Sequence, residues 1–344
     1  MAIKRLAIWV DAAYSNDALF DPLSPLNRDN CLSAYRLLKD QLQAGGWECR
    51  THDVYKAGGI TPDAVLFTDM PKVRPDTLLG DWSGRVRKLA VLLECAVIKP
   101  QNWLPGSHNG FDTVFTWDEK YIDNCKYFKI NFPNPFPDST TANPLNKSGF
   151  CVMITANKKS SHPLELYSER EKTVRWFERS HPGEFNLYGM GWDRRIFTGP
   201  KLVRALNRFG ALARLTATKY PSYRGVVAEK KPVIEKYRFS ICYENAREIP
   251  GYITEKIFDC FFAGNIPVYW GAPDIEKYIP RDCFIDRRDF ASHEQLYAYM
   301  KGRSDSDLLK YIEAARAYLS SPAAYQFSDR YFAETIVKTL LGKI

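Results

Sequence analysis

Apolar residues along the chain follow two alternating patterns. Short, nearly continuous apolar runs are typical of strands buried on both faces, and apolar residues three and four positions apart are typical of helices. In the first half such runs predict strands at 5–10, 47–54, 62–69, 87–100 and 111–118, and an amphipathic helix at 30–46. Alternation of this kind indicates a parallel sheet covered on both faces.

The alternation resumes after a segment of different composition. Residues 130–149 are rich in Pro, Asn and Ser, which is typical of a linker. Beyond it the pattern predicts helices at 165–182, 254–263, 306–321 and 327–344, and strands at 150–157, 184–189, 235–245, 266–271 and 283–290.

Chain length sets the number of domains. A chain of 344 residues is long for one hydrophobic core. We therefore predict an α/β protein with two Rossmann-like, doubly wound domains at 1–147 and 148–325. We expect the last helix, at 326–344, to pack back on the first domain.

Positive charge is concentrated in one part of the chain. The net charge is +8, and many of the basic residues fall between Arg170 and Lys236. This favours a polyanionic partner such as phosphate, nucleic acid or an anionic membrane surface. A solvated basic face explains the charge equally well.

Cysteines and histidines give no sign of a metal site. The eight cysteines include no C-x-x-C pair, and the five histidines are isolated. We therefore expect free thiols in a reducing compartment. Asp305 and Asp307 fit the D-x-D pattern of metal-dependent transferases, but they stand at a predicted helix start, where capping is the ordinary role.

No segment predicts a membrane span. Asp11 interrupts the first apolar run, which is too short for a signal core. We expect a cytoplasmic protein with at most a weak peripheral contact at the inner membrane surface. The amphipathic segment 330–344 would make that contact, although its few lysines are too few for a firm anchor.

Residues just after predicted strands are the first candidates for chemistry, because ligands of open parallel sheets bind beyond the carboxyl ends of the strands. They are Glu94, Asn157, Glu244 and Asn245. Glu94 follows a strongly apolar strand, and partial burial suits a carboxylate to act as a general base by raising its pKa. A carboxylate that only caps the neighbouring loop is the alternative.

Two cations stand at predicted helix starts. Lys256 lies in a first turn, where free N–H groups and the helix dipole favour phosphate, and Arg170 has a similar place after the strand at 150–157. The alternatives are a solvated lysine and a surface ion pair of Arg170 with Glu169 or Glu171. No G-x-G-x-x-G or Walker A pattern occurs.

Three of these candidates, Glu244, Asn245 and Lys256, fall within one long motif. The run "YRFSICYENAREIPGYITEKIFDCFFAGNIPVYWGAPDIEKYIPRDCFID" resembles the signature of the α-1,3-fucosyltransferases of glycosyltransferase family 10. Similarity extends to "YSERE", "FNLYGMGW" and "SYRG", and it is weakest in the first 80 or so residues.

The resemblance implies a GT-B fold, with two Rossmann-like domains facing each other across a cleft, the first (1–147) binding the acceptor and the second (148–325) the GDP-sugar donor. It implies an inverting enzyme that moves L-fucose from GDP-fucose to a glycan hydroxyl. Glu94 takes the position of the general base. The donor residues it implies are Arg170 and Lys256 at the diphosphate, Asn245, Tyr252 and Glu255 lining the donor site, and Tyr188, Gly189, Tyr223 and Gly225 near the guanine.

The resemblance also implies a bacterial, soluble member with a GDP-sugar donor and no required metal or cofactor. The acceptor stays open among lactosamine-type glycans, lipopolysaccharide chains, glycolipids and other surface saccharides. Another GDP-deoxyhexose is an alternative donor. A basic nucleic-acid-binding protein is the alternative of a different class, although no nucleic-acid-binding motif is present and we expect no such partner.

Overall fold

Parallel strands form two separate sheets in the part of the chain that the computed structural model describes, residues 3–137, 147–195, 197 and 200–343. Each sheet belongs to one of two compact units. Unit 1 comprises Met1–Phe136, Ile249–Glu255 and Ser321–Ile344, and unit 2 comprises Pro137–Glu248 and Lys256–Ser320. Part of the predicted linker, 138–146, lies outside the described residues.

The sheet of unit 1 has the strand order β2-β1-β3-β4-β5-β6, with parallel neighbours throughout. Its strands are β1 (Lys4–Trp9), β2 (Trp47–Thr51), β3 (Ala64–Thr68), β4 (Arg87–Leu92), β5 (Thr113–Thr116) and β6 (Tyr127–Lys129). The five strands predicted here are all present. The pattern missed β6, because three residues are too short for a periodic signal.

Two predicted strands of this unit are too long. The segment 87–100 leaves the sheet after Leu92, where β4 ends. The segment 47–54 leaves the sheet at Thr51, and α2 (His52–Ala57) begins at the next residue. The carboxylate of Asp17 accepts hydrogen bonds from the backbone N–H of Thr51 at 2.8 Å and from its hydroxyl at 3.2 Å. This contact from a distant loop ends the strand, and local sequence does not reveal it.

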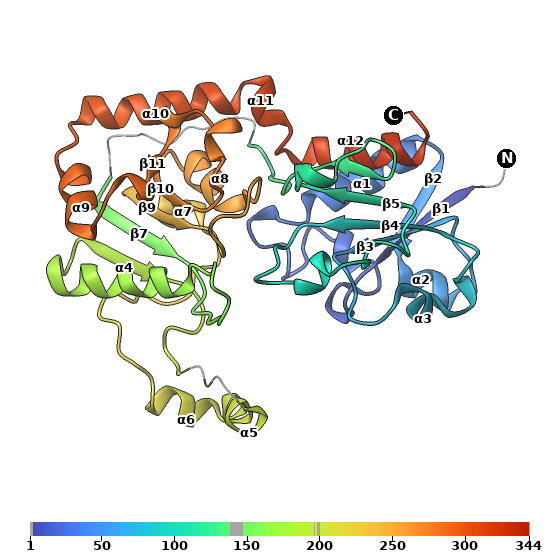
Figure 1. Cartoon of the computed structure of the whole chain (residues 1–344), viewed down its shortest axis with the longest axis horizontal. Helices are drawn as coiled ribbons and strands as arrows, with labels where there is room; N and C mark the ends of the chain where they lie inside the picture. Colours follow the sequence, from blue (N-terminus) through green and yellow to red (C-terminus); the bar gives the residue numbers. More distant parts are fainter. Residues whose placement is uncertain (1–2, 138–146, 196, 198–199, 344) are drawn as a thin grey trace. The chain divides into compact units, whose positions relative to one another are not determined.

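Helices cover both faces of this sheet (Figure 1). On one face α1 (Ser33–Ala44) packs beside α12 (Asp329–Leu340), and both contribute to one core with β1. The other face packs against α2 and α3 (Pro75–Leu79). The last helix is therefore part of the core of unit 1, and α11 (Pro322–Tyr325) precedes it in the same unit.

The sheet of unit 2 has the order β11-β10-β9-β7-β8, again with parallel neighbours. Its strands are β7 (Gly149–Ile154), β8 (Phe185–Tyr188), β9 (Tyr237–Tyr243), β10 (Ile266–Trp270) and β11 (Ile285–Asp286). The chain passes from β7 outward to β8 and then returns to place β9 on the other side of β7. That reversal is the topological switch point, where open α/β sheets bind ligands.

The helices of this unit include several that the pattern predicted. They are α4 (Tyr167–Ser180), α5 (Lys201–Ala205), α6 (Gly210–Leu215), α7 (Lys231–Ile234), α8 (Glu255–Phe262), α9 (His293–Lys301) and α10 (Asp305–Leu319). Ser304 caps α10 and bonds with Asp307 in a capping box, so the D-x-D residues form a helix start as predicted. The pattern did not predict α5, α6, α7 and α9.

All eight cysteines are free thiols; Cys31 and Cys125 are exposed and the others are buried. Among the described residues, no helix combines the length and the apolar character needed to cross a membrane. Within the same residues, no group of three or more His, Cys, Asp or Glu side chains is arranged to hold a metal ion.

Candidate functional site

Arg170 joins the two strands that flank the switch point of unit 2. Its Nη1 donates to Thr155 Oγ1, just after β7, at 2.9 Å. Its Nη2 donates to Tyr243 O, at the end of β9, at 2.7 Å and to Asn245 Oδ1 at 3.1 Å. The side chain is only 3% exposed, which excludes the alternative of a surface ion pair. The structure thus brings Arg170 and Asn245, two of the predicted donor residues, into contact.

The two loops expected near guanine also lie together. Gly189 N donates to Gly225 O at 2.9 Å, and Tyr223 Oη donates to Gly189 O at 2.9 Å. Tyr188 ends β8, and its hydroxyl lies 3.3 Å from that of Tyr237. Because β8 neighbours β7 in the sheet, these loops and Thr155 share one edge of unit 2.

Gly189 has a reason to be glycine. Its φ is +129°, and a Cβ there would lie 2.0 Å from Thr155 O. Asn157, a strand-end candidate, holds the same region: its Nδ2 donates to Gly191 O at 3.0 Å. Asn157 therefore has a structural contact that fixes the loop after β8.

Lys256 lies in the first turn of α8, and its Nζ stands 3.2 Å from Glu244 Oε2. The lysine side chain is 22% exposed, whereas Glu244 is fully buried. Since a buried carboxylate is stable only with charged or hydrogen-bonding partners, this pair fixes Lys256 at the helix start. Glu255, the first residue of α8, is half-buried.

The sequence indicated that Glu244 would lie at the site, but it did not indicate that Lys256 would be its partner. Glu244 follows β9, where we expected site residues, but its pairing with Lys256 depends on the fold. Gly271 makes room for it, because a Cβ at Gly271 would lie 2.5 Å from Glu244 Cγ and from Tyr269 Oη. Burial, followed by the charge of Glu244, raises the pKa of Tyr269 well above its usual value.

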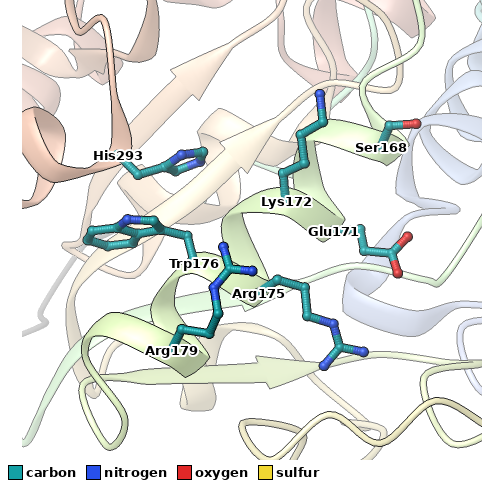
Figure 2. Close-up of a pocket in the computed structure, with 7 residues that line it drawn as sticks. All are labelled: Ser168, Glu171, Lys172, Arg175, Trp176, Arg179 and His293. Carbon is teal, nitrogen blue, oxygen red and sulfur yellow. The ribbon is translucent and has the colours of Figure 1, made fainter.

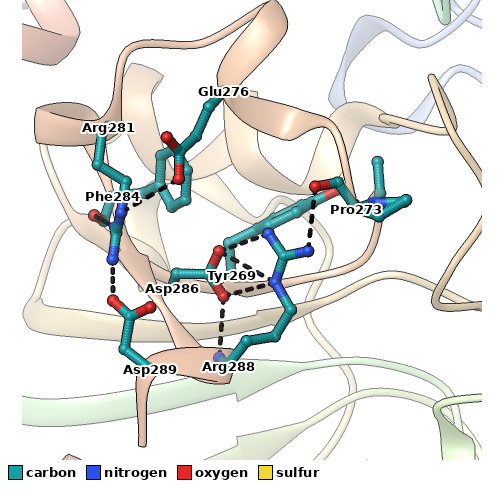
Figure 3. A network of polar contacts seen from close by, with 9 residues as sticks. Tyr269, Pro273, Glu276, Arg281, Phe284, Asp286, Arg288 and Asp289 are labelled. Carbon is teal, nitrogen blue, oxygen red and sulfur yellow. Dashed lines mark hydrogen bonds and ion pairs between the residues drawn. The ribbon is translucent and has the colours of Figure 1, made fainter.

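A polar network braces the loop after β10 (Figure 3). Asp286, at the end of β11, accepts from Arg288 Nε at 2.9 Å and from Nη2 at 2.6 Å. Arg288 Nη1 donates to Pro273 O at 3.2 Å. These contacts tie the loop that contains Gly271 to the neighbouring strand.

Glu94 lies in unit 1, in the loop after β4, and is half-buried. Its Oε2 accepts a hydrogen bond of 3.3 Å from the hydroxyl of Tyr252, which is itself fully buried. The ring of Tyr252 packs against Trp117 with centroids 5.3 Å apart. The structure therefore brings the predicted base together with one predicted donor residue.

The backbone of Glu94 is held by residues that sequence reasoning missed. Asp69 Oδ1 accepts from Leu93 N at 2.9 Å and from Glu94 N at 3.2 Å. Asn102 Nδ2 donates to Asp69 Oδ1 at 2.7 Å and to Glu94 O at 2.9 Å. Asp69 also directly follows a strand, which is the one local signal for its role.

The pocket of about 550 Å³ in unit 2 is not formed by the predicted donor residues (Figure 2). Its lining comes from one face of α4 and the start of α9, namely Ser168, Glu171, Lys172, Arg175, Trp176, Arg179 and His293. At 100° per residue, Arg170 belongs to the opposite, buried face of α4. We therefore assign no donor role to this pocket.

Comparison with known proteins shows similarity to fucosyltransferases. Residues 205–330 match the sequence model of "Glycosyltransferase family 10 (fucosyltransferase) C-term". The chain is 36% identical over 75 residues to an α-(1,3)-fucosyltransferase, FucT, of Helicobacter pylori. It is 35% identical over 77 residues to an α-(1,4)-fucosyltransferase of Arabidopsis thaliana. The predicted resemblance to glycosyltransferase family 10 is confirmed.

The matched stretches are short. They cover 22% of this chain in both relatives, and only 16% and 19% of the lengths of those relatives. The similarity to these relatives therefore concerns about a fifth of the chain. The family model covers residues 205–330, which include the long motif of the second half.

Solved structures extend the likeness to the whole fold. An α1,3-fucosyltransferase with GDP matches with a TM-score of 0.53 at 16% identity, over 97% of this chain and 90% of that protein. Anabaena Alr3699/HepE, in complex with UDP and glucose, matches with a TM-score of 0.58 at 11% identity, over 98% of this chain and 100% of that protein. The predicted GT-B class of α/β fold is confirmed.

Proposed function

We propose that the chain is a fucosyltransferase that moves L-fucose from GDP-fucose to a hydroxyl of a glycan acceptor. The observation that carries the proposal is the cluster at the switch point of unit 2. There Arg170 donates to Asn245, and Asn245 and the Lys256–Glu244 pair stand on the motif that resembles glycosyltransferase family 10. Two of the similar solved structures contain GDP or GDP-fucose.

The cations at this edge suit a departing nucleoside diphosphate. As the bond from the anomeric carbon to the β-phosphate oxygen breaks, negative charge grows on GDP. A positioned lysine and arginine and a helix N-terminus stabilise that charge more in the transition state than in the ground state. Arg170 and Lys256 are already held in place by Thr155, Tyr243 and Glu244, so little ordering is needed when the donor binds. We propose that these groups suffice without a metal.

We assign the general base to Glu94. An acceptor hydroxyl has a pKa far above neutrality and must lose its proton as its oxygen attacks the anomeric carbon. The carboxylate of Glu94 accepts that proton, the new C–O bond forms, and GDP leaves with the electrons of the old bond. Attack on the side opposite GDP inverts the anomeric configuration. Tyr252 donates to Glu94 Oε2, and this hydrogen bond orients the carboxylate for proton transfer.

A donor comparison tests the function. Purified protein is mixed with GDP-fucose, GDP-mannose or UDP-glucose and a panel of lactosamine-type and other surface glycans, with and without a chelator. We expect transfer from GDP-fucose at an unchanged rate in chelator. Transfer only from another GDP-sugar would make the alternative donor correct, and failure to bind GDP in calorimetry would overturn the proposal. Loss of transfer in chelator would overturn the metal-independent mechanism.

A further inference from the structure

The segment between β8 and α7 has an unusual distribution of charge. From 194 to 228 the sequence contains no Asp or Glu. Its Lys and Arg residues up to position 219 are Arg194, Arg195, Lys201, Arg204, Arg208, Arg214 and Lys219. Asp193, just before the segment, pairs with Arg194 at 3.2 Å and with Arg214 at 3.8 Å. The segment thus contributes much of the net positive charge of the chain.

The same segment exposes large apolar side chains. Leu202 and Leu215 are each 86% exposed, and Phe209 is 61% exposed. They belong to α5, to α6 and to the turn between them. Large apolar side chains exposed on one short segment are unfavourable in water and are typical of a surface that binds a partner.

Hydrogen bonds join described residues that are far apart in this segment. The side chain of Asn207 accepts from Phe197 N and donates to Phe197 O, both at 2.9 Å. Arg195 N donates to Ala213 O at 2.7 Å. The chain therefore goes out, turns and returns with its two short helices at the tip (Figure 1). We call the described residues of this segment (194, 195, 197 and 200–219) the basic hairpin.

We propose that the basic hairpin docks the protein on a lipid bilayer with anionic headgroups. Lys and Arg side chains extend toward headgroup phosphates while Leu202, Phe209 and Leu215 enter the boundary of the acyl chains. Charge complementarity selects an anionic surface and rules out pairing with a second copy of the same hairpin. A nucleic acid would use the charges, but it offers nothing to the two exposed leucines.

The apolar face of α12 does not provide this contact. Phe332, Ile336 and Leu340 are buried in the core of unit 1, so the C-terminal helix expected at the membrane has its apolar face covered. We therefore propose the membrane contact at the basic hairpin and not at 330–344. This proposal does not depend on which sugar the protein transfers.

Vesicle flotation tests the proposal. The full chain is mixed with vesicles of phosphatidylcholine alone, or with added phosphatidylglycerol, at low and high salt. We expect binding only with phosphatidylglycerol and a marked loss at high salt, since salt screens the attraction. A cation near such a surface contributes about fivefold in partition, so Lys201→Glu with Arg208→Glu should lower binding by at least roughly 25-fold. A second variant, Leu202→Ser with Phe209→Ser, should also lose binding while its charge is unchanged.

Matched controls make the same kinds of substitution at exposed residues outside the basic hairpin. Lys72→Glu with Arg74→Glu makes the same charge change on exposed residues of unit 1, and Leu23→Ser removes an apolar side chain that is 89% exposed. Both controls should bind like the wild type, and all variants should keep the wild-type thermal midpoint. Equal binding of the hairpin variants and the wild type would overturn the proposal. So would absence of binding to anionic vesicles, or loss of binding in the apolar variant no greater than in Leu23→Ser.

Discussion

Glu94 shows how a single residue is prepared by its neighbours. Asp69 and Asn102 hold its backbone, and Tyr252 bonds its carboxylate. A general base works only when its oxygen stands within hydrogen-bond reach of the proton it removes. These contacts leave the side chain few alternatives in direction, which is the property that a base requires.

Glu94→Gln should lower turnover by ~10²–10⁴, because the amide preserves shape but cannot accept the proton. GDP affinity should stay nearly unchanged, as should the thermal midpoint. Wild-type turnover should fall on the acid side as the carboxylate becomes protonated. Steady-state kinetics and calorimetry measure these quantities.

Glu48→Gln is the control, since Glu48 is a surface carboxylate of the same unit, paired with Arg5 at 3.2 Å. Near-normal turnover in Glu94→Gln would transfer the role of base to Asp118 or Glu119. Both of those are in ion pairs, with Lys120 at 2.9 Å and with Lys129 at 3.3 Å.

Lys256→Ala should lower kcat/KM for the donor. The expected loss of transition-state stabilisation is about 2–4 kcal/mol, the usual scale of one lost positioned charge contact. The substitution should also destabilise the fold, because buried Glu244 loses a partner. Kinetics below the thermal midpoint separate the two effects.

Lys230→Ala is a close match for the comparison. Lys230 pairs at 2.7 Å with Asp259, which lies in α8 like Lys256, and both side chains are mostly buried. We expect Lys230→Ala to lower stability while kcat/KM stays near that of the wild type. Equal kinetic losses in the two variants would mean that Lys256 acts only through stability.

At the scale of elements, α9 docks on α4 through its first residue. His293 Nε2 lies 2.9 Å from Thr173 Oγ1, and its ring stacks on Trp176 with centroids 5.6 Å apart. Burial, followed by the positive charge of Arg287, lowers the pKa of His293 below its usual value. The folded state therefore binds this proton less readily than the unfolded state does.

The lowered pKa of His293 makes the stability of the folded protein depend on pH. Above about pH 6.5, the usual pKa of histidine, both states are neutral and the docking contact contributes fully. Below that pH the unfolded state takes up the proton first, so stability falls as the pH falls. His293→Gln removes the titration and should flatten the decline of the thermal midpoint between pH 7 and pH 5. An equally steep decline in the variant would assign the acid sensitivity to other groups.

At the scale of the whole molecule, the chain returns to unit 1 at its end. Asn134 N donates to Phe327 O, and Asp329 N donates to Asn134 O, each at 2.9 Å. Ser33 Oγ then bonds Asp329 Oδ2 at 2.6 Å and joins α1 to α12. Unit 1 is thus built from segments at both ends of the chain.

Ile336→Ala should destabilise the protein by about 2–5 kcal/mol, the usual cost of truncating a fully buried aliphatic side chain. Deletion from Tyr331 onward should prevent stable folding of unit 1. Lys338→Ala on the exposed face of the same helix should change stability by less than about 0.5 kcal/mol. Thermal and urea unfolding measure these changes. An unchanged midpoint in Ile336→Ala would mean that α12 is a surface tail.

The sequence by itself determined the class of the fold and most of its strands. Buried parallel strands must be apolar on both faces, so the runs at β1, β3, β4 and β9 were visible without a structure. The motif from Tyr237 to Asp286 was equally visible, because its residues are close in sequence.

Tertiary structure decided the contacts between distant segments. The Asp17 contact that ends β2, the support of Glu94 by Asp69 and Asn102, and the return of α12 to unit 1 all join residues far apart in the chain. The sequence pointed to Arg170 as a cation at a helix start, and only the fold placed it between β7 and β9 as a buried side chain. Local patterns record which face of an element is apolar, whereas the order of strands in a sheet decides which strand ends meet.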